Sequence, residues 1–176
     1  MTRRGDGATF ADPGPPELSA ACLSEAGLQV ATQIPVSGPA RVLLIEDSEP
    51  DVFLVREALE QCDREIDLQV LEDGELAVEL IERIDGEGIR SPDLILLDLN
   101  LPKRSGAQVL ERVRASPACA EIPVVILTSS DSPKDKSQTA RLGATAYFRK
   151  PSRLNEFMLL GPLVQRLLSG SQSAAS

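Results

Sequence analysis

Histidine and tryptophan are absent from this 176-residue sequence, and cysteine occurs only three times. Without histidine, the chain cannot carry a Ser/His or Cys/His catalytic pair or any histidine-containing metal site. Cys22, Cys62 and Cys119 stand far apart with no C-x-x-C spacing, so neither a disulfide framework nor a zinc site is predicted. Any general base or metal ligand must therefore be a carboxylate, Lys, Tyr, Cys or a backbone group.

Basic residues are scarce as well: 18 Lys plus Arg stand against 27 Asp plus Glu, which gives a net charge of −9. Nucleic-acid binding needs a basic face, and no long basic run is present. No apolar stretch approaches the length of a membrane span, and residues 5–40 hold none of signal-peptide length. We therefore expect a cytoplasmic protein that binds neither nucleic acid nor membrane.

The first forty residues differ in texture from the rest of the chain. Ten of these forty positions are Gly or Pro, a composition that seldom builds a core. From residue 41 onward, apolar runs alternate with helical patterns, and the length suits one ordinary domain. The predicted organisation is a flexible leader over 1–40 with at most a weak helix within 17–30, a folded domain over 41–168, and a disordered tail over 169–176.

Three short apolar runs, at 42–45, 94–97 and 124–127, are rich in Val, Ile and Leu and are bounded by Pro, Asp or Ser. Such runs are typical of strands buried on both faces of a parallel sheet. Residues 66–71 instead alternate apolar and polar side chains, which predicts a half-exposed edge strand. Residues 144–149 make a plausible fifth strand.

Helical patterns separate these strands. Apolar residues recur at helical spacing within 77–84 and 106–113, and Pro50 marks the first turn of a helix that follows Ser48. The segment 132–142 has few apolar residues, so its helix should bury little surface.

A last helix is expected to be capped by Ser152 and to kink or end at Gly161-Pro162. The order is thus five strands alternating with five helices. This alternation predicts right-handed crossovers and a doubly wound α/β sheet, with any ligand at the carboxyl ends of the strands.

Five polar residues stand at or just after those carboxyl ends: Glu46, Asp47, Asp98, Thr128 and Lys150. Taken singly, each has an ordinary explanation as a solvated acid, a helix N-terminal charge, a turn former or an exposed cation. Those explanations do not predict all five at strand ends. Three converging carboxylates repel one another unless a cation neutralises them, and oxygen ligands favour Mg²⁺. With Mg²⁺, Asp98 can act as a nucleophile on phosphorus while Lys150 and Thr128 contact phosphoryl oxygens.

These residues carry a family resemblance. Residues 41–168 resemble the receiver domain of two-component response regulators, in which an acidic pair follows strand one, a phospho-accepting Asp ends strand three, a Thr or Ser ends strand four, and Lys-Pro follows strand five. The separations of thirty residues from Asp98 to Thr128 and twenty-two from Thr128 to Lys150 fit that family closely. The matching segments are VLLIEDSEPD, LILLDLNLPKRSG, VVILTSS and AYFRKP.

The resemblance implies a flavodoxin-like, five-stranded parallel sheet of order 2-1-3-4-5 with helices on both faces. It also implies Mg²⁺ ligation by Asp47 and Asp98 directly, by Glu46 through water, and by the backbone carbonyl of Asn100.

The same resemblance assigns further roles around the pocket. It implies a cis peptide between Lys150 and Pro151 that aims the ammonium into the pocket. Tyr147 matches the aromatic residue that rotates inward when Thr128 moves toward the phosphoryl group, although a strand-edge aromatic packed on a helix is the simpler role. Asn100 and Ser130 occupy the two positions that tune how fast the acyl phosphate hydrolyses.

The segments LLDLNLPKRSG and SPACAEIPVVILTSSD most resemble the corresponding sequences of single-domain regulators that partner bacterial and cyanobacterial phytochromes. The resemblance therefore implies a stand-alone response regulator that takes a phosphoryl group onto Asp98 from a sensor histidine kinase. Such a protein catalyses its own phosphorylation and hydrolysis and is not otherwise an enzyme. It would signal by a protein contact, with a homodimer through residues 132–168 as one form of that contact.

Two other classes remain open. A haloacid-dehalogenase-like phosphatase also uses a strand-end Asp with Mg²⁺, but that family needs a second Asp two residues later, where this chain has Asn100. A receiver-fold interaction module that is never phosphorylated is the other alternative, although such modules typically lack part of the pocket.

Overall fold

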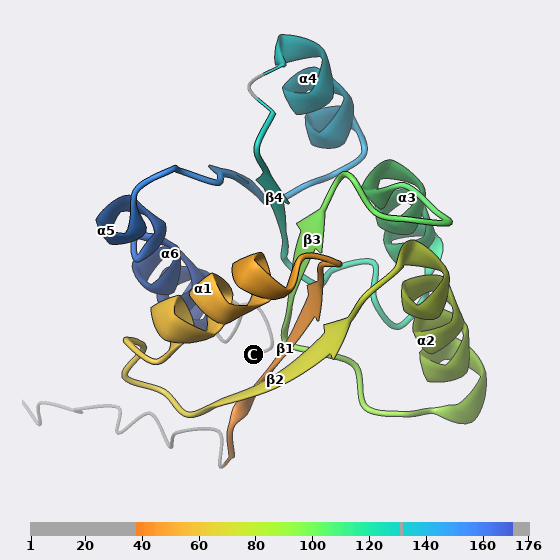
Figure 1. Cartoon of the computed structure of the whole chain (residues 1–176). Helices are drawn as coiled ribbons and strands as arrows, with labels where there is room; N and C mark the ends of the chain where they lie inside the picture. The colour runs from red at the N-terminus through yellow and green to blue at the C-terminus, as the bar shows by residue number, and fades with distance from the viewer. Residues whose placement is uncertain (1–37, 131, 171–176) are drawn as a thin grey trace, which may run out of the picture. The chain divides into compact units, whose positions relative to one another are not determined.

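The computed structural model describes residues 38–130 and 132–170 (Figure 1). Five parallel strands form one sheet in the order β2-β1-β3-β4-β5. This order confirms the predicted doubly wound α/β fold. The strands are β1 (Ala40–Ile45), β2 (Ile66–Leu71), β3 (Leu94–Asp98), β4 (Val124–Thr128) and β5 (Ala146–Arg149).

Helices follow the strands and cover both faces of the sheet. Figure 1 shows α2 and α3 together on one side, and α1, α5 and α6 together on the other. The helices are α1 (Glu49–Leu59), α2 (Gly74–Glu87), α3 (Gly106–Ala115), α4 (Pro133–Arg141), α5 (Leu154–Phe157) and α6 (Leu160–Gly170).

The three central strands bury side chains on both faces, as their uninterrupted apolar runs predict. Alternate residues of each strand enter different cores because side chains along a strand point to opposite faces. On β3, for example, Ile95 and Leu97 join the core that includes residues of α2 and α3, whereas Leu94 and Leu96 join the core that includes residues of α1 and α6. The edge strand β2 alternates half-buried and exposed residues over most of its length, which confirms the prediction for residues 66–71.

The end of the chain corrects one prediction. Ser152 does not cap the last helix, and the break comes at Met158 and Leu159, before Gly161-Pro162. Gly161 and Pro162 instead lie in the first turn of α6, where a missing proline N–H removes no helical hydrogen bond. Gly161 is needed there because a Cβ would collide with the carbonyl oxygen of Ala58 in α1.

Helix α4 is held differently from its neighbours. Of its nine residues, all described, only Thr139 is buried. Its C-terminal end is fixed by Arg114 of α3, whose guanidinium donates to the carbonyl of Gly143 at 2.7 and 3.0 Å and to the carbonyls of Ala120 and Ile122 at 2.8 and 2.9 Å. This helix is therefore attached mainly at its ends.

Ordered elements extend slightly beyond the predicted limits of residues 41 and 168, from the start of β1 to the end of α6. Most of the predicted leader, the weak helix within 17–30 and most of the predicted tail lie outside the described residues. Among the helices that are described, none has the length and apolar character needed to cross a membrane.

Candidate functional site

The strand-end residues come together at the carboxyl edge of the sheet. Glu46 follows β1, Asp98 ends β3, and Lys150 follows β5. The Lys150 Nζ donates to Glu46 Oε2 at 2.6 Å and to Asp98 Oδ2 at 2.8 Å. The predicted convergence of these side chains is thus present, although 52 and 104 residues separate Lys150 from its two partners in sequence.

A third carboxylate completes the surroundings of this ammonium. Asp51, in the first turn of α1, accepts a hydrogen bond from Lys150 Nζ at 2.8 Å. An ammonium has three N–H donors, so each finds one carboxylate partner. The side chain of Lys150 is only 9% exposed and that of Glu46 is fully buried, which makes these charge-assisted contacts strong.

Burial raises the pKa of Glu46 to about 7, against the opposing effect of its hydrogen bond from Lys150. The nearby charges of Asp98 and Asp51 add to the rise. For Lys150, burial alone would lower the pKa, but the hydrogen bonds to Asp51, Asp98 and Glu46 outweigh it and raise the pKa above its ordinary value. The lysine therefore stays charged.

Three of the acids also lie close enough to share a cation. One carboxylate oxygen each from Glu46, Asp47 and Asp98 lie within 4.8 Å of one another, with Asp47 exposed to solvent and the other two buried. The set contains only oxygen donors and one open side, as a hard divalent cation that keeps some of its waters requires. These residues fit Mg²⁺.

On the other side of Asp98, the end of β4 places a hydroxyl. Thr128 is fully buried, and its Oγ1 accepts a hydrogen bond from the backbone N–H of Ser130 at 3.0 Å. The hydroxyl of Tyr147 on β5 donates to the carbonyl oxygen of Ser130 at 2.9 Å, and the ammonium of Lys136 lies 5.3 Å from the Tyr147 ring centroid. A chain of contacts thus joins the pocket to β5 and α4.

The loop after β3 is packed tightly around Asp98. Its Oδ1 accepts a hydrogen bond from the backbone N–H of Asn100 at 3.0 Å. A Cβ on Gly106, at the start of α3, would collide with the backbone carbonyl of Asp98, so only glycine allows this approach. Asn100 itself is exposed beside the buried carboxylate.

Comparison with known proteins agrees with this geometry. Residues 42–160 match the family described as "Response regulator receiver domain". The chain belongs to the response regulator receiver family. Receivers are signalling modules that partner sensor histidine kinases.

Phytochrome response regulators are among the similar proteins. The Response regulator Rcp1 of Synechocystis is 38% identical over 120 residues, a match that spans 67% of this chain and 81% of that protein. The structure of the phosphorylated cyanobacterial phytochrome response regulator RcpA has a TM-score of 0.66 at 30% identity and covers 79% of this chain and 98% of its own. The Mn²⁺-bound form of Rcp1 has a TM-score of 0.64 at 36% identity, with 74% and 93% covered. The similarity to phytochrome response regulators predicted from sequence is confirmed.

The receiver's Lys150–Pro151 peptide corrects another prediction. No cis peptide bond occurs in residues 38–130 and 132–170, so this peptide is trans. The backbone N–H of Lys150 donates to the Thr128 carbonyl at 2.8 Å, which continues the pairing of β5 with β4. From that position the side chain already reaches all three carboxylates, and a cis bond is not needed to aim it.

Asp51 is the site residue that the sequence reasoning missed. It lies in the first turn of α1, directly after the Pro50 that marks the start of that helix, whereas Asp47 precedes the helix. An acid in the first turn of a helix ordinarily favours the helix dipole, and that explanation hides the second role. No local spacing marks Asp51, because its partner Lys150 lies 99 residues away in sequence.

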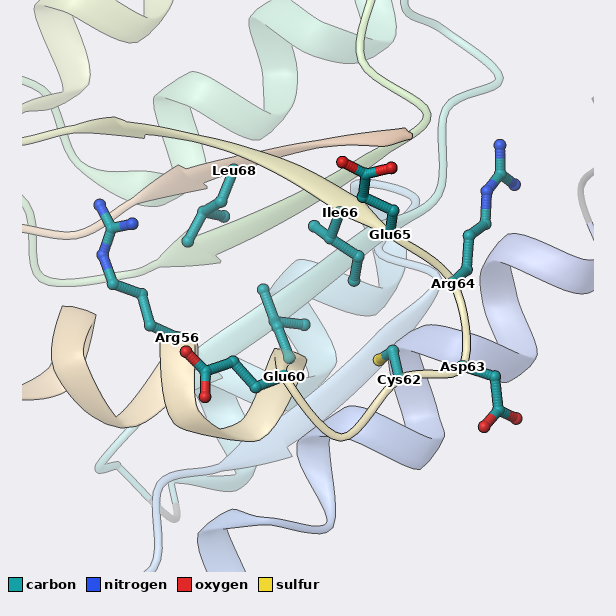
Figure 2. Close-up of a pocket in the computed structure, with 9 residues that line it drawn as sticks. Arg56, Glu60, Cys62, Asp63, Arg64, Glu65, Ile66 and Leu68 are labelled. Carbon is teal, nitrogen blue, oxygen red and sulfur yellow. The ribbon is translucent and has the colours of Figure 1, made fainter. Parts of the chain in front are cut away.

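A hollow of about 350 Å³ lies elsewhere on the receiver, between the end of α1 and the start of β2 (Figure 2). It is at the amino end of β2, whereas the acidic pocket is at the carboxyl ends of the strands. Burial, with the charge of Asp63, raises the pKa of the Cys62 thiol, so this cysteine is not an activated nucleophile. Its lining residues are Arg56, Leu59, Glu60, Cys62, Asp63, Arg64, Glu65, Ile66 and Leu68.

Proposed function

We propose that this receiver is a phospho-acceptor that takes a phosphoryl group onto Asp98 from the phosphohistidine of a sensor histidine kinase. One observation carries the proposal: the Asp98 carboxylate lies 2.8 Å from a buried ammonium and within one oxygen cluster with Glu46 and Asp47. This arrangement puts a nucleophile beside a fixed ammonium and beside oxygen ligands for a cation, which together can supply the positive charge that a phosphoryl group needs.

Each residue has a defined task in the transfer. An oxygen of Asp98 forms a bond to phosphorus while the bond between phosphorus and the kinase imidazole nitrogen breaks, and the imidazole leaves. Lys150 turns from its carboxylate partners toward a phosphoryl oxygen, and the Thr128 hydroxyl donates to another. In the hydrolysis step, water attacks phosphorus, which restores the Asp98 carboxylate and releases inorganic phosphate.

Mg²⁺ would be held by Asp47 and Asp98, by Glu46 through water and by the backbone carbonyl of Asn100. When bound, it neutralises phosphoryl charge. The need for a cation follows from the charges: the pocket holds one ammonium and the four carboxylates of Glu46, Asp47, Asp51 and Asp98, so its formal charge is −3 when all are ionised. A pocket this negative would otherwise repel a phosphoryl donor.

The same proposal gives Asn100 and Ser130 an influence on the lifetime of the phosphate. Each lies two residues beyond a pocket residue, and each backbone N–H donates to that residue's side chain, Asp98 or Thr128.

Similarity to Rcp1 and RcpA supports a phytochrome as the kinase, in the cytoplasm. Membership of the receiver family leaves the phosphatase alternative without support. The remaining alternative, a receiver that is never phosphorylated, makes the opposite prediction in a direct test. The chain would be incubated with Mg²⁺ and acetyl phosphate or phosphoramidate and analysed by mass spectrometry. A hydroxylamine-sensitive mass increase of one phosphoryl group on Asp98 supports the proposal, and an unchanged mass contradicts it.

The output surface is proposed to lie within residues 132–168, in the form of a homodimer or another protein contact without nucleic acid. Support comes from the sparse burial of α4 and from Leu154 and Leu159, which are 59% and 62% exposed. Hydrogen exchange and light scattering with and without beryllofluoride would test it. Protection changes confined to residues 50–84 would assign the surface elsewhere.

A further inference from the structure

Ser130 is the meeting point of three parts of the receiver. Its backbone N–H donates to Thr128 Oγ1 in the pocket, and its carbonyl accepts from the Tyr147 hydroxyl of β5. Its side chain faces α4: the hydroxyl donates to Asp135 Oδ2 at 2.9 Å and accepts from the backbone N–H of Ser132 at 3.2 Å. All the hydrogen-bonding groups of this residue are therefore engaged at once.

We propose that Asp135 is a positioning residue that, through Ser130, holds the β4–α4 connection in its unphosphorylated arrangement and so sets how readily the receiver switches. The inference rests on the proposed function, because switching is the response to a phosphoryl group on Asp98. Asp135 does not touch the pocket itself. It lies in the first turn of α4 and acts on Ser130, which is two residues after Thr128.

Thr128 is fully buried, and its Oγ1 accepts the hydrogen bond from the Ser130 N–H. To donate to a phosphoryl oxygen, the Thr128 side chain has to move toward Asp98, and Ser130 then loses its acceptor. Ser130 can follow only if its other bonds also rearrange. The bond from its hydroxyl to the Asp135 carboxylate is charge-assisted and thus the strongest of these restraints.

The bond between Ser130 and Asp135 would also transmit a movement of Ser130 to α4. Ser132 caps this helix by accepting from the backbone N–H of Asp135 at 3.4 Å, so Ser130 and Ser132 both engage its first turn. The helix buries only Thr139 along its length and offers little other resistance. A shift of Ser130 therefore displaces the N-terminal end of α4.

The occupied hydroxyl also separates two roles for Ser130. A serine that polarised the attacking water would need a hydroxyl proton directed at that water, but here the proton is donated to Asp135. The effect of Ser130 on phosphate lifetime is therefore indirect and shared with Asp135.

A double-mutant cycle on the full chain tests this assignment. Tyr147 is the only tyrosine and tryptophan is absent, so intrinsic emission reports on the hydroxyl bonded to Ser130. Each of Ser130→Ala, Asp135→Ala and the double variant would be titrated with beryllofluoride in the presence of Mg²⁺. We expect each single variant to bind about fivefold more tightly, which corresponds to the loss of one hydrogen bond that favours the unphosphorylated state, and the double variant to bind no more tightly than either.

Two controls accompany the cycle. Glu75→Ala removes an acid from the first turn of α2 without touching Ser130 and should leave the titration unchanged. Asp135→Asn preserves the helix terminus if alanine unfolds α4, and should shift the titration in the same direction by a smaller factor because a neutral amide oxygen still accepts.

Acrylamide quenching of Tyr147 without beryllofluoride gives a measurement that does not depend on phosphorylation. Quenching should rise in both single variants and rise no further in the double variant. If the wild-type chain binds beryllofluoride but the variants respond as the wild type does, or the effects of the two single variants add in the double variant, the role of Asp135 is overturned. A wild-type chain that ignores beryllofluoride contradicts the proposed function instead, and the quenching cycle then still decides whether Asp135 restrains Ser130.

Discussion

Helices α3 and α4 occupy equivalent places in the fold but are held in opposite ways. Each follows a strand that ends in a pocket residue, Asp98 for α3 and Thr128 for α4. Helix α3 has a complete capping box between Ser105 and Gln108, presses Gly106 against the Asp98 backbone and buries an apolar stripe. Helix α4 buries only Thr139 along its length.

The same order of strand, loop and helix can thus serve two different mechanical requirements. The proposed nucleophile, Asp98, must keep its position at the end of β3, and the close approach of Gly106 at the start of α3 fixes its backbone. A helix that responds to this residue, as we propose for α4, must be displaced by small free energies, because differential contacts supply only a few kcal/mol. The sparse packing of α4 keeps its displacement within that range.

The largest expected effect concerns the fixed side of the pocket. Asp98→Asn should abolish phosphorylation by acetyl phosphate, because the amide is not a nucleophile, while the fold persists because Lys150 keeps Glu46 and Asp51 as partners. Mass spectrometry and a melting curve check both parts. Asp67→Asn, on the exposed surface of β2, is the matched control and should still be phosphorylated. Acid-labile phosphate on another residue of the Asp98→Asn variant would show that the nucleophile is misassigned.

Two leucine truncations test whether α3 is packed more firmly than α4. Leu110→Ala removes a fully buried side chain of α3 and should lower the free energy of unfolding by about 3 kcal/mol. Leu142→Ala, at the half-buried end of α4, should cost about 1 kcal/mol. Urea denaturation of both variants measures the difference. Equal losses would mean that α4 is held as firmly as α3.

Binding of Mg²⁺ at the acidic pocket should stabilise the folded protein. At a hundredfold excess over its dissociation constant, Mg²⁺ should raise the free energy of unfolding by about 2.7 kcal/mol. Asp47→Asn should remove most of this gain, since the carboxylate is one of the three that share the oxygen cluster. Glu49→Gln, an exposed acid two residues along the chain, should retain it. A melting temperature indifferent to millimolar Mg²⁺ in the wild-type chain contradicts the site.

A smaller effect is expected from pH. Because burial raises the pKa of Glu46 from 4.5 to about 7, the folded state binds this proton more tightly than the unfolded state. Without Mg²⁺, the contribution of Glu46 to stability is therefore full below its ordinary pKa and is lost as the pH rises through about 7. Glu46→Gln should flatten that part of the stability profile. Mg²⁺ titrations should show the opposite trend, with affinity that rises across the same range as the competing proton leaves.

Much of the fold could be predicted from sequence because its signals are local. Runs such as 94–97 are apolar without interruption, which only a strand covered on both faces requires, and this gave the parallel sheet. The convergence of Glu46, Asp98 and Lys150 then followed, because parallel strands share one carboxyl edge.

What sequence could not give depends on three-dimensional fit. Gly161-Pro162 carries a helix-breaking signal, but its glycine is required by the approach to Ala58, a contact between helices that no local pattern records. Asp51 looked like an ordinary helix N-terminal acid until the position of Lys150 was known. The expected cis peptide at Pro151 came from the family resemblance and from no local pattern, and this peptide is trans.

The clamp that Arg114 places on Gly143 gives α4 one stationary end. A helix that is anchored at its C-terminus and released at Ser132 swings about the anchor, so its movement grows with distance from Gly143. Amide exchange along α4 should accordingly be graded on addition of beryllofluoride, with the largest change at Lys136 and the smallest at Leu142. Uniform change along the helix would mean that it shifts as a whole. The surface that α4 offers to a partner would thus change in orientation more than in position.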